Sequence, residues 1–153
     1  MTTALATCAL AISAASAQTQ EISENGSREA TIGSPDYFTG TALIEPIYSN
    51  SEPFFGSAAI VTFLPGARSN WHEHPAGQRL VVIDGKGWVQ EEGGEKQTIE
   101  PGDVVWCPPG VKHWHGATDT TRMSHYAIQQ FNDAKTVVWG EAVSDEQYHG
   151  ASK

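Results

Sequence analysis

The sequence predicts an all-β protein with one domain, built as a closed barrel or as two packed antiparallel sheets. Three observations lead to this prediction. Short runs rich in β-branched and aromatic residues alternate with turn signals, and no apolar stripe with a 3.6-residue period accompanies them. A chain of 153 residues with 39% hydrophobic residues can bury one core, and its 15 glycines and 8 prolines favour short strands over long helices.

Seven or more strands are expected, separated by turns that contain glycine or proline. Turns such as Leu64-Pro65-Gly66 and Pro108-Pro109-Gly110 supply the fixed or positive φ angle that a tight turn requires. The expected strands cover residues 39–45, 58–64, 79–83, 87–90, 97–99, 104–107 and 122–130. This number and spacing of strands is typical of β-sandwiches and barrels.

The N-terminal part of the chain differs from the strand region in composition. Residues 1–17 carry no charge and end in Ala15-Ser16-Ala17, which is typical of a secretory signal with its cleavage site. The basic n-region is missing, so a plain N-terminal extension is the alternative. We expect a periplasmic or secreted protein if the signal is real and a cytoplasmic one otherwise. Residues 18–35 are polar and predict an arm, which leaves 36–150 as the folded domain.

The C-terminal end predicts a short helix, and the charge balance excludes some partners. Ser144 and Gln147 have the spacing of a capping box, which predicts one or two helical turns. The net charge is −9 and no cluster of basic residues occurs, so a nucleic-acid partner is not expected. The apolar N-terminal run is shorter than the roughly 20 residues that span a bilayer, so no membrane span is expected. Cys107 lies in a strand-like run without a second cysteine nearby, which favours a buried structural thiol.

Four of the six histidines lie in two tight groups, Trp71-His72-Glu73-His74 and His113-Trp114-His115. Residues i and i+2 of a strand point to the same face, so His72 and His74 project together. A lone buried histidine is more often a hydrogen-bonded core residue than a ligand, but two such pairs are hard to explain as core. With Gln78 nearby, they predict a metal site.

The segments around these histidines resemble the two motifs of the cupins, G-x5-H-x-H-x3,4-E-x6-G and G-x5-P-x-G-x2-H-x3-N. Residues 66–85 match the first motif at every spacing, with Gln78 in place of the glutamate, and residues 102–117 match the second, with Ala117 in place of the asparagine. The resemblance implies a double-stranded β-helix, or jelly-roll barrel. It also implies one divalent metal per chain, held by His72, His74, Gln78 and His113.

Gln78 is the departure from the cupin motif with the clearest chemical consequence. A neutral glutamine leaves the full charge on the metal, and one unit of charge at about 4 Å is worth roughly 4 kcal/mol at an effective dielectric constant of 20. A more positive site favours anionic ligands and Lewis-acid chemistry over oxidation. The alternative is that Gln78 is a polar wall residue without a bound metal.

The flanking segments, among them residues 36–40, 63–68 and 145–148, look like those of small bacterial manganese-dependent cupins that act as hydroxynitrile lyases. This resemblance implies manganese, with iron, nickel or zinc as alternatives. It also implies His115 as the acid/base, with His125 and Gln129 as further polar lining. Strand alternation adds two residues that face the pocket and would set substrate size, Ala59 and Val61.

The expected function is therefore a metal-dependent lyase that cleaves or forms cyanohydrins, with a small molecule as its partner. A metal-dependent cupin oxygenase or isomerase is one alternative, and a non-catalytic module that binds a small ligand is another. A homo-oligomer, dimer or tetramer, is expected for two reasons. The resemblance implies pairing through barrel faces, and the outward-facing side chains of Trp71, Trp88 and Trp114 would otherwise leave apolar area in water.

Overall fold

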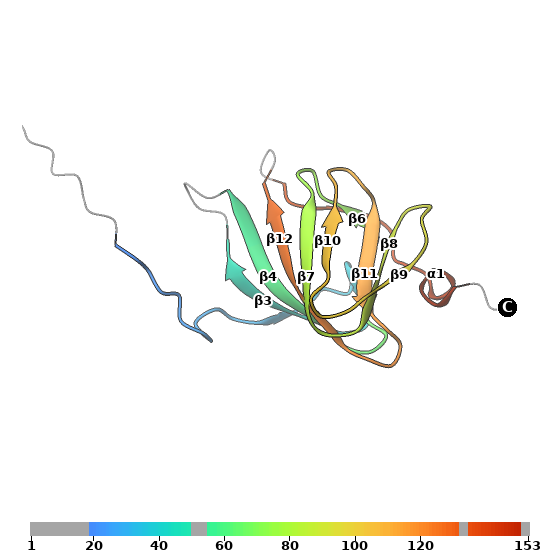
Figure 1. Ribbon diagram of the computed structural model, residues 1–153, viewed down its shortest axis with the longest axis horizontal. Helices are drawn as coiled ribbons and strands as arrows, with labels where there is room; N and C mark the ends of the chain where they lie inside the picture. Colours follow the sequence, from blue (N-terminus) through green and yellow to red (C-terminus); the bar gives the residue numbers. More distant parts are fainter. Residues whose placement is uncertain (1–18, 50–54, 132–134, 151–153) are drawn as a thin grey trace, which may run out of the picture.

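A computed structural model describes residues 19–49, 55–131 and 135–150 of the chain. The expected signal segment, 1–17, lies outside these residues. The described chain forms thirteen strands and one five-residue helix, and the strands build two curled antiparallel sheets (Figure 1). The predicted all-β barrel is confirmed. No helix in the described ranges is long and apolar enough to cross a membrane.

The first sheet has six strands, and its long central strands are paired along most of their length. Its strand order is β1 (Thr31–Ile32), β3 (Ala42–Tyr48), β4 (Gly56–Phe63), β12 (Met123–Gln130), β7 (Gln78–Gly85) and β10 (Val104–Cys107). One face of this sheet carries the apolar core, in which Phe63, Leu80 and Met123 are fully buried. A register shift between Ser124 and His125 interrupts the pairing of β12 with β7.

The second sheet is made of shorter strands and carries both histidine groups. Its order is β13 (Val138–Trp139), β6 (His72–Glu73), β11 (His113–Ala117), β5 (Arg68–Ser69) and β2 (Phe38–Thr39), while β8 (Gly87–Glu91) pairs with β11 and β9 (Gln97–Ile99) pairs with β8. The histidine pairs thus lie on a sheet that faces the central strands of the first one.

Most of the expected strands occur within two residues of their predicted bounds, and residues 97–99 and 104–107 match them. The expected strand 39–45 is broken instead at Gly40, whose φ is 75° and where a Cβ would lie 2.9 Å from the Ala67 backbone. Thr31 and Ile32, inside the expected arm, pair with β3. The strand β11, which carries His113 and His115, was not among the expected strands.

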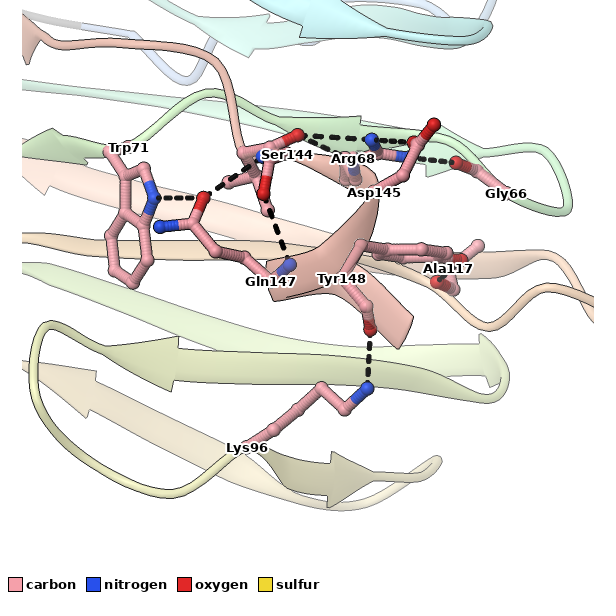
Figure 2. A network of polar contacts seen from close by, with 10 residues as sticks. Gly66, Arg68, Trp71, Lys96, Ala117, Ser144, Asp145, Gln147 and Tyr148 are labelled. Carbon is pink, nitrogen blue, oxygen red and sulfur yellow. Dashed lines mark hydrogen bonds and ion pairs between the residues drawn. The ribbon is translucent and has the colours of Figure 1, made fainter. Parts of the chain in front are cut away.

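The predicted C-terminal helix is confirmed as α1 (Asp145–His149), and its capping box between Ser144 and Gln147 is formed. The helix packs on the outer face of the second sheet (Figure 2). There Trp114 and Tyr148 are fully buried, together with Trp71 and Val143. The expectation that outward-facing Trp71, Trp88 and Trp114 leave apolar area in water without a second copy is therefore wrong, because Trp71 and Trp114 are buried against this segment and Trp88 packs on the same cluster. The alternation of residues along the strand correctly predicted that these side chains point away from the core. The C-terminal segment then packs over them.

A polar network holds this C-terminal segment in place, as Figure 2 shows. The buried guanidinium of Arg68 donates to the Val143 carbonyl at 3.0 Å and to the Asp145 carboxylate at 2.6 Å. The Tyr148 hydroxyl donates to the Ala117 carbonyl at 2.8 Å, and Lys96 donates to the Tyr148 carbonyl. The segment is thereby attached to β5, to β11 and to Lys96, the residue before β9.

Candidate metal centre

Three histidines converge at one end of the space between the sheets. His72 on β6 and His113 on β11 are direct partners across the two strands, and His74 follows β6. One ring nitrogen from each of the three lies within 4.8 Å of the others. All three side chains are buried, with at most 3% of each residue exposed. These residues could hold a metal ion.

Backbone carbonyl groups select the same tautomer for all three rings. Nδ1 of His72 donates to the Asn70 carbonyl at 2.9 Å, and Nδ1 of His113 donates to the Val111 carbonyl at 2.9 Å. Nδ1 of His74 donates to the Thr136 carbonyl at 2.5 Å. A carbonyl can only accept, so each neutral ring carries its proton on Nδ1 and presents a lone pair at Nε2. This is the arrangement that orients metal-ligating histidines.

The surroundings keep these imidazoles neutral. Burial, followed by the nearby His113 and His74 rings, holds the pKa of His72 well below its ordinary value of 6.5. Burial lowers the pKa of His74 to about 4, and it also lowers the pKa of His113. Neutral rings with free Nε2 lone pairs are the form in which histidine binds a metal.

Gln78 approaches the three histidines from β7 in the opposite sheet. Its amide nitrogen donates to Oε1 of Gln129 at 2.9 Å, which turns its oxygen toward Nε2 of His113 at 3.4 Å. Both of these facing atoms are acceptors, so no proton can join them. The buried Nε2 of His74 also has no hydrogen-bond partner among the described residues. A cation would satisfy all three atoms, and the residues present therefore fit a metal ion.

A cavity of about 300 Å³ opens next to this cluster. His72, His74, Gln78 and His115 form its polar end, while the remaining wall is mostly apolar. The predicted pocket residues Ala59, Val61 and Gln129 all lie in this wall. Other lining residues are Phe38, Ile44, Pro46, Tyr48, Ser49, Ser57, Ala58, Ser69, Ala127, Val137 and Trp139. His113 borders a smaller hollow of about 120 Å³ on its other side, beside Cys107.

Cys107 matches the expected buried thiol. It is 4% exposed, and burial raises its pKa to about 12, so it stays protonated at neutral pH. A protonated thiol is neither a good nucleophile nor a metal ligand.

One wall of the cavity is an aromatic cluster that sequence reasoning missed. The Trp139 ring stacks on Tyr37 with centroids 4.7 Å apart, meets Phe38 edge-on at 5.6 Å and lies 4.9 Å from the His72 ring. Trp139 belongs to a two-residue strand that pairs with His72. A strand this short has no periodic signal in the sequence.

His115 and His125 form a buried pair at the inner side of the cavity. Nδ1 of His115 lies 3.2 Å from Nε2 of His125, so one proton is shared between these two nitrogens. Burial, and then His125, holds the pKa of His115 well below its ordinary value, and burial lowers the pKa of His125 to about 4. His115 lines the cavity as expected.

His125 departs from the expected role of polar lining. It is fully buried behind His115 and is not part of the cavity wall. It lies on β12 with its ring directed inward, and the His115 ring covers it.

Comparisons with known proteins agree with this architecture. Residues 59–128 match the family model described as the cupin domain. The chain is 53% identical over 128 residues to the (R)-mandelonitrile lyase of Granulicella tundricola, an alignment that covers 84% of this chain and 98% of the relative.

Solved structures give the same fold. A cupin-like protein from Thermotoga maritima superposes with a TM-score of 0.75 at 37% identity, over 88% of this chain and 98% of that one. A cupin-2 domain from Rhodospirillum rubrum superposes with a TM-score of 0.65 at 12% identity, over 86% and 85% of the two chains. The alignments with the Granulicella tundricola and Thermotoga maritima proteins have high identity and cover most of both chains, so this chain belongs to the cupin family.

Proposed function

We propose that this cupin is a metal-dependent lyase that cleaves cyanohydrins to a carbonyl compound and hydrogen cyanide, and that catalyses the reverse addition. The observation that carries the proposal is the polar end of the cavity, which His72, His74, Gln78 and His115 line, with the His113 ring 4.4 Å from that of His72 and the remaining wall mostly apolar. The 53% identity to a protein named (R)-mandelonitrile lyase supports it.

The proposed ligands are Nε2 of His72, His74 and His113 together with Oε1 of Gln78. All four ligand groups are neutral, so the ion would keep its whole charge. When bound, a divalent ion such as manganese would supply a positive charge that acidifies a nearby hydroxyl and polarises a carbonyl. Iron, nickel and zinc accept the same nitrogen and oxygen donors.

His115 is proposed to move the proton. With Nδ1 occupied by His125, Nε2 of His115 is the nitrogen left to face the cavity. It takes the hydroxyl proton of the cyanohydrin, the O–H electron pair becomes the second bond of the carbonyl, and the C–C pair leaves with cyanide. The proton held on His115 then passes to cyanide, so His115 ends as it began.

Gln129 is proposed to help hold the leaving cyanide. Its oxygen accepts from Gln78 at 2.9 Å, and its amide nitrogen donates to Ser57 at 3.3 Å, so the group is fixed on the cavity wall. An amide nitrogen carries two N–H bonds, and the contact with Ser57 uses one of them. The second can donate to an anion in the cavity.

The aromatic wall supports an aryl-substituted substrate. Trp139 and Phe38 present ring surfaces to the cavity, opposite the small side chains of Ala59 and Val61. Offset and edge-on contacts between aromatic rings contribute about 0.5–1.5 kcal/mol beyond area burial. A benzaldehyde-derived cyanohydrin matches a cavity of this lining.

The test combines metal analysis of the purified protein with an oxygen-free assay of mandelonitrile cleavage. We expect close to one transition-metal ion per chain and cleavage at the same rate with and without oxygen. A reaction that requires oxygen would favour the oxygenase alternative. Metal-loaded protein that binds mandelonitrile without turnover would favour the binding module, and either result would contradict the proposal.

A further inference from the structure

Residues 135–148 contact the metal centre at one end and are anchored elsewhere on the second sheet at the other. We call this segment the C-terminal clamp. At its first end the Thr136 carbonyl accepts from Nδ1 of His74, and Trp139 forms part of the cavity wall. Its other end, α1, is attached to the last residue of β11, the strand that begins with His113. The clamp thus spans from the proposed ligands to the far end of the strand that carries one of them.

Two of the proposed ligands depend on the clamp for their position. His72 begins β6, a strand of two residues that pairs with β11 on one side and with β13 of the clamp on the other. Its direct partner on β13 is Trp139, whose ring lies 4.9 Å from the His72 ring. His74 donates from Nδ1 to the Thr136 carbonyl. Without the clamp, His72 would keep one neighbouring strand and His74 would lose its acceptor.

The contact continues along the backbone next to β6. The Gly140 amide donates to the Trp71 carbonyl at 2.8 Å, and the Trp71 amide donates back to the clamp at 2.9 Å. A Cβ on Gly140 would lie 3.0 Å from the Trp71 carbonyl oxygen, so the two backbones are in close contact. The side chain of Asn70 donates to the Gly140 carbonyl at 3.4 Å, and the Asn70 carbonyl orients His72. Detachment of the clamp would therefore disturb the acceptors of both proposed ligands.

The two ends of the clamp are held unequally. At the anchor, fully buried Tyr148 donates its hydroxyl proton to the Ala117 carbonyl at 2.8 Å, and the Arg68 guanidinium stacks over the Tyr148 ring at 4.4 Å (Figure 2). At the metal centre, β13 is an edge strand of two residues, and Val138 is 43% exposed. Short edge segments with few buried contacts open locally at low free energy. The anchor is therefore what keeps β13 in place.

We propose that the clamp is a positioning element of the metal centre, and that a bound ion leaves only when the clamp detaches from β6. The cavity alone offers no exit, because its opening to solvent leaves all four donor groups in place. Detachment removes the acceptor that orients His74, which frees this ring to turn away from the ion. The inference rests on the proposed metal centre but not on the proposed reaction.

The first test holds the clamp closed with a disulfide. Val138 and Glu73 are direct partners across β13 and β6. Opposed residues of antiparallel strands have Cα atoms about 4.5–5.5 Å apart, which a disulfide can span. Both side chains point away from the cavity, because those of the neighbouring Trp139 and His72 line it. Glu73→Cys/Val138→Cys protein is loaded with manganese(II), and the rate at which excess EDTA removes the ion is measured before and after reduction.

We expect the oxidised double variant to release its ion at least tenfold more slowly than the same protein after reduction. Wild-type protein is the control, and its release rate should not respond to the reductant. Equal release from the oxidised and reduced forms would overturn the inference while leaving the metal centre intact. Wild-type protein that binds no ion would overturn the metal centre itself, and this inference with it.

The second test weakens the anchor without changing the contact with β6. Tyr148→Phe removes one hydroxyl and its hydrogen bond of 2.8 Å, and it should speed release about fivefold, the effect of one lost hydrogen bond. Thr62→Val is the matched control, because it also removes a hydroxyl with a 2.8 Å hydrogen bond, to Ser124 in the other sheet. Both variants should lose similar stability in thermal unfolding, but Thr62→Val should keep the wild-type release rate. Equal acceleration in both variants would assign release to global unfolding and contradict the proposal.

Discussion

Replacing Gln78 by glutamate tests why a neutral amide occupies this position. The change keeps the side chain's length and its ligating oxygen but adds one negative charge beside the proposed ion. One unit of charge at about 4 Å is worth roughly 4 kcal/mol at an effective dielectric constant of 20. If about a third of this energy is lost at the transition state, where cyanide and oxygen carry negative charge, cleavage falls about tenfold.

The structure adds a second consequence of this substitution. Gln78 donates to Gln129 at 2.9 Å, and a carboxylate cannot donate. Loss of that hydrogen bond costs about 1 kcal/mol, and two acceptors then face each other until the Gln129 amide rotates. Gln129→Glu tests the neighbouring group, because its carboxylate can still accept from Gln78 and from the Ser57 hydroxyl but no longer offers the N–H proposed to hold cyanide.

The assay compares metal content and oxygen-free mandelonitrile cleavage in the two variants, each loaded with one ion per chain. We expect Gln78→Glu to bind metal at least as tightly as the wild type and to cleave at least tenfold more slowly. Gln129→Glu should keep its metal and also cleave more slowly, because its carboxylate repels the leaving cyanide. Cleavage by metal-loaded Gln78→Glu at the wild-type rate or faster would refute the charge argument, whatever the ligand set.

Three further predictions concern the metal, the substrate and pH. His72→Ala should reduce metal content by at least tenfold, whereas His149→Ala, at an exposed position on α1, should keep it; metal analysis decides. Trp139→Ala should lower kcat/KM for mandelonitrile about tenfold relative to an aliphatic cyanohydrin, and an equal loss for both substrates would contradict aryl contact. The metal-free protein should lose stability as pH falls from 6.5 toward 4. Burial lowers the pKa of His74 and of His125 to about 4, so over this range both histidines take up protons in the unfolded state but not in the folded state. Each of these two histidines contributes about 3 kcal/mol to the fall in the free energy of unfolding over that range. Thermal unfolding at several pH values measures the fall, and a stability that does not change between pH 6.5 and 4 would contradict the prediction.

Much of the metal centre was predictable because its geometry is local. His72 and His74 are two residues apart, and the alternation of a strand sends both to one face whatever the rest of the chain does. The turns were predictable for the same reason, since glycine and proline act on their own φ angles. Gln78 was found through its spacing in a motif, but its contact with Gln129 depends on the register of β7 with β12.

The covering of the two sheets could not be predicted from local pattern. Trp71 and Trp114 alternate with histidines in the same way as Val104 and Trp106 alternate with core residues, yet the first pair is buried and the second exposed. The difference comes from the C-terminal segment, which attaches to Arg68 more than 70 residues earlier in the chain. The same alternation therefore gives buried side chains on one sheet and exposed side chains on the other, depending on which sheet the C-terminal segment covers.

The chemistry of the His115–His125 pair also depends on packing that the local sequence pattern does not predict. Both histidines were proposed for the pocket by resemblance, but β11 and β12 belong to different sheets, so no strand pairing sets the distance between them. Packing of the sheets brings the rings to 3.2 Å and turns His125 from a residue expected to touch substrate into one that acts through His115. A proton on Nε2 of His125 leaves His115 without one on Nδ1, and His115 then presents an N–H to the cavity. When Nδ1 of His115 carries that proton instead, the lone pair at Nε2 faces the substrate. The buried partner thus selects between the acid and base forms of His115, a role set by the ring contact between sheets and not by either motif.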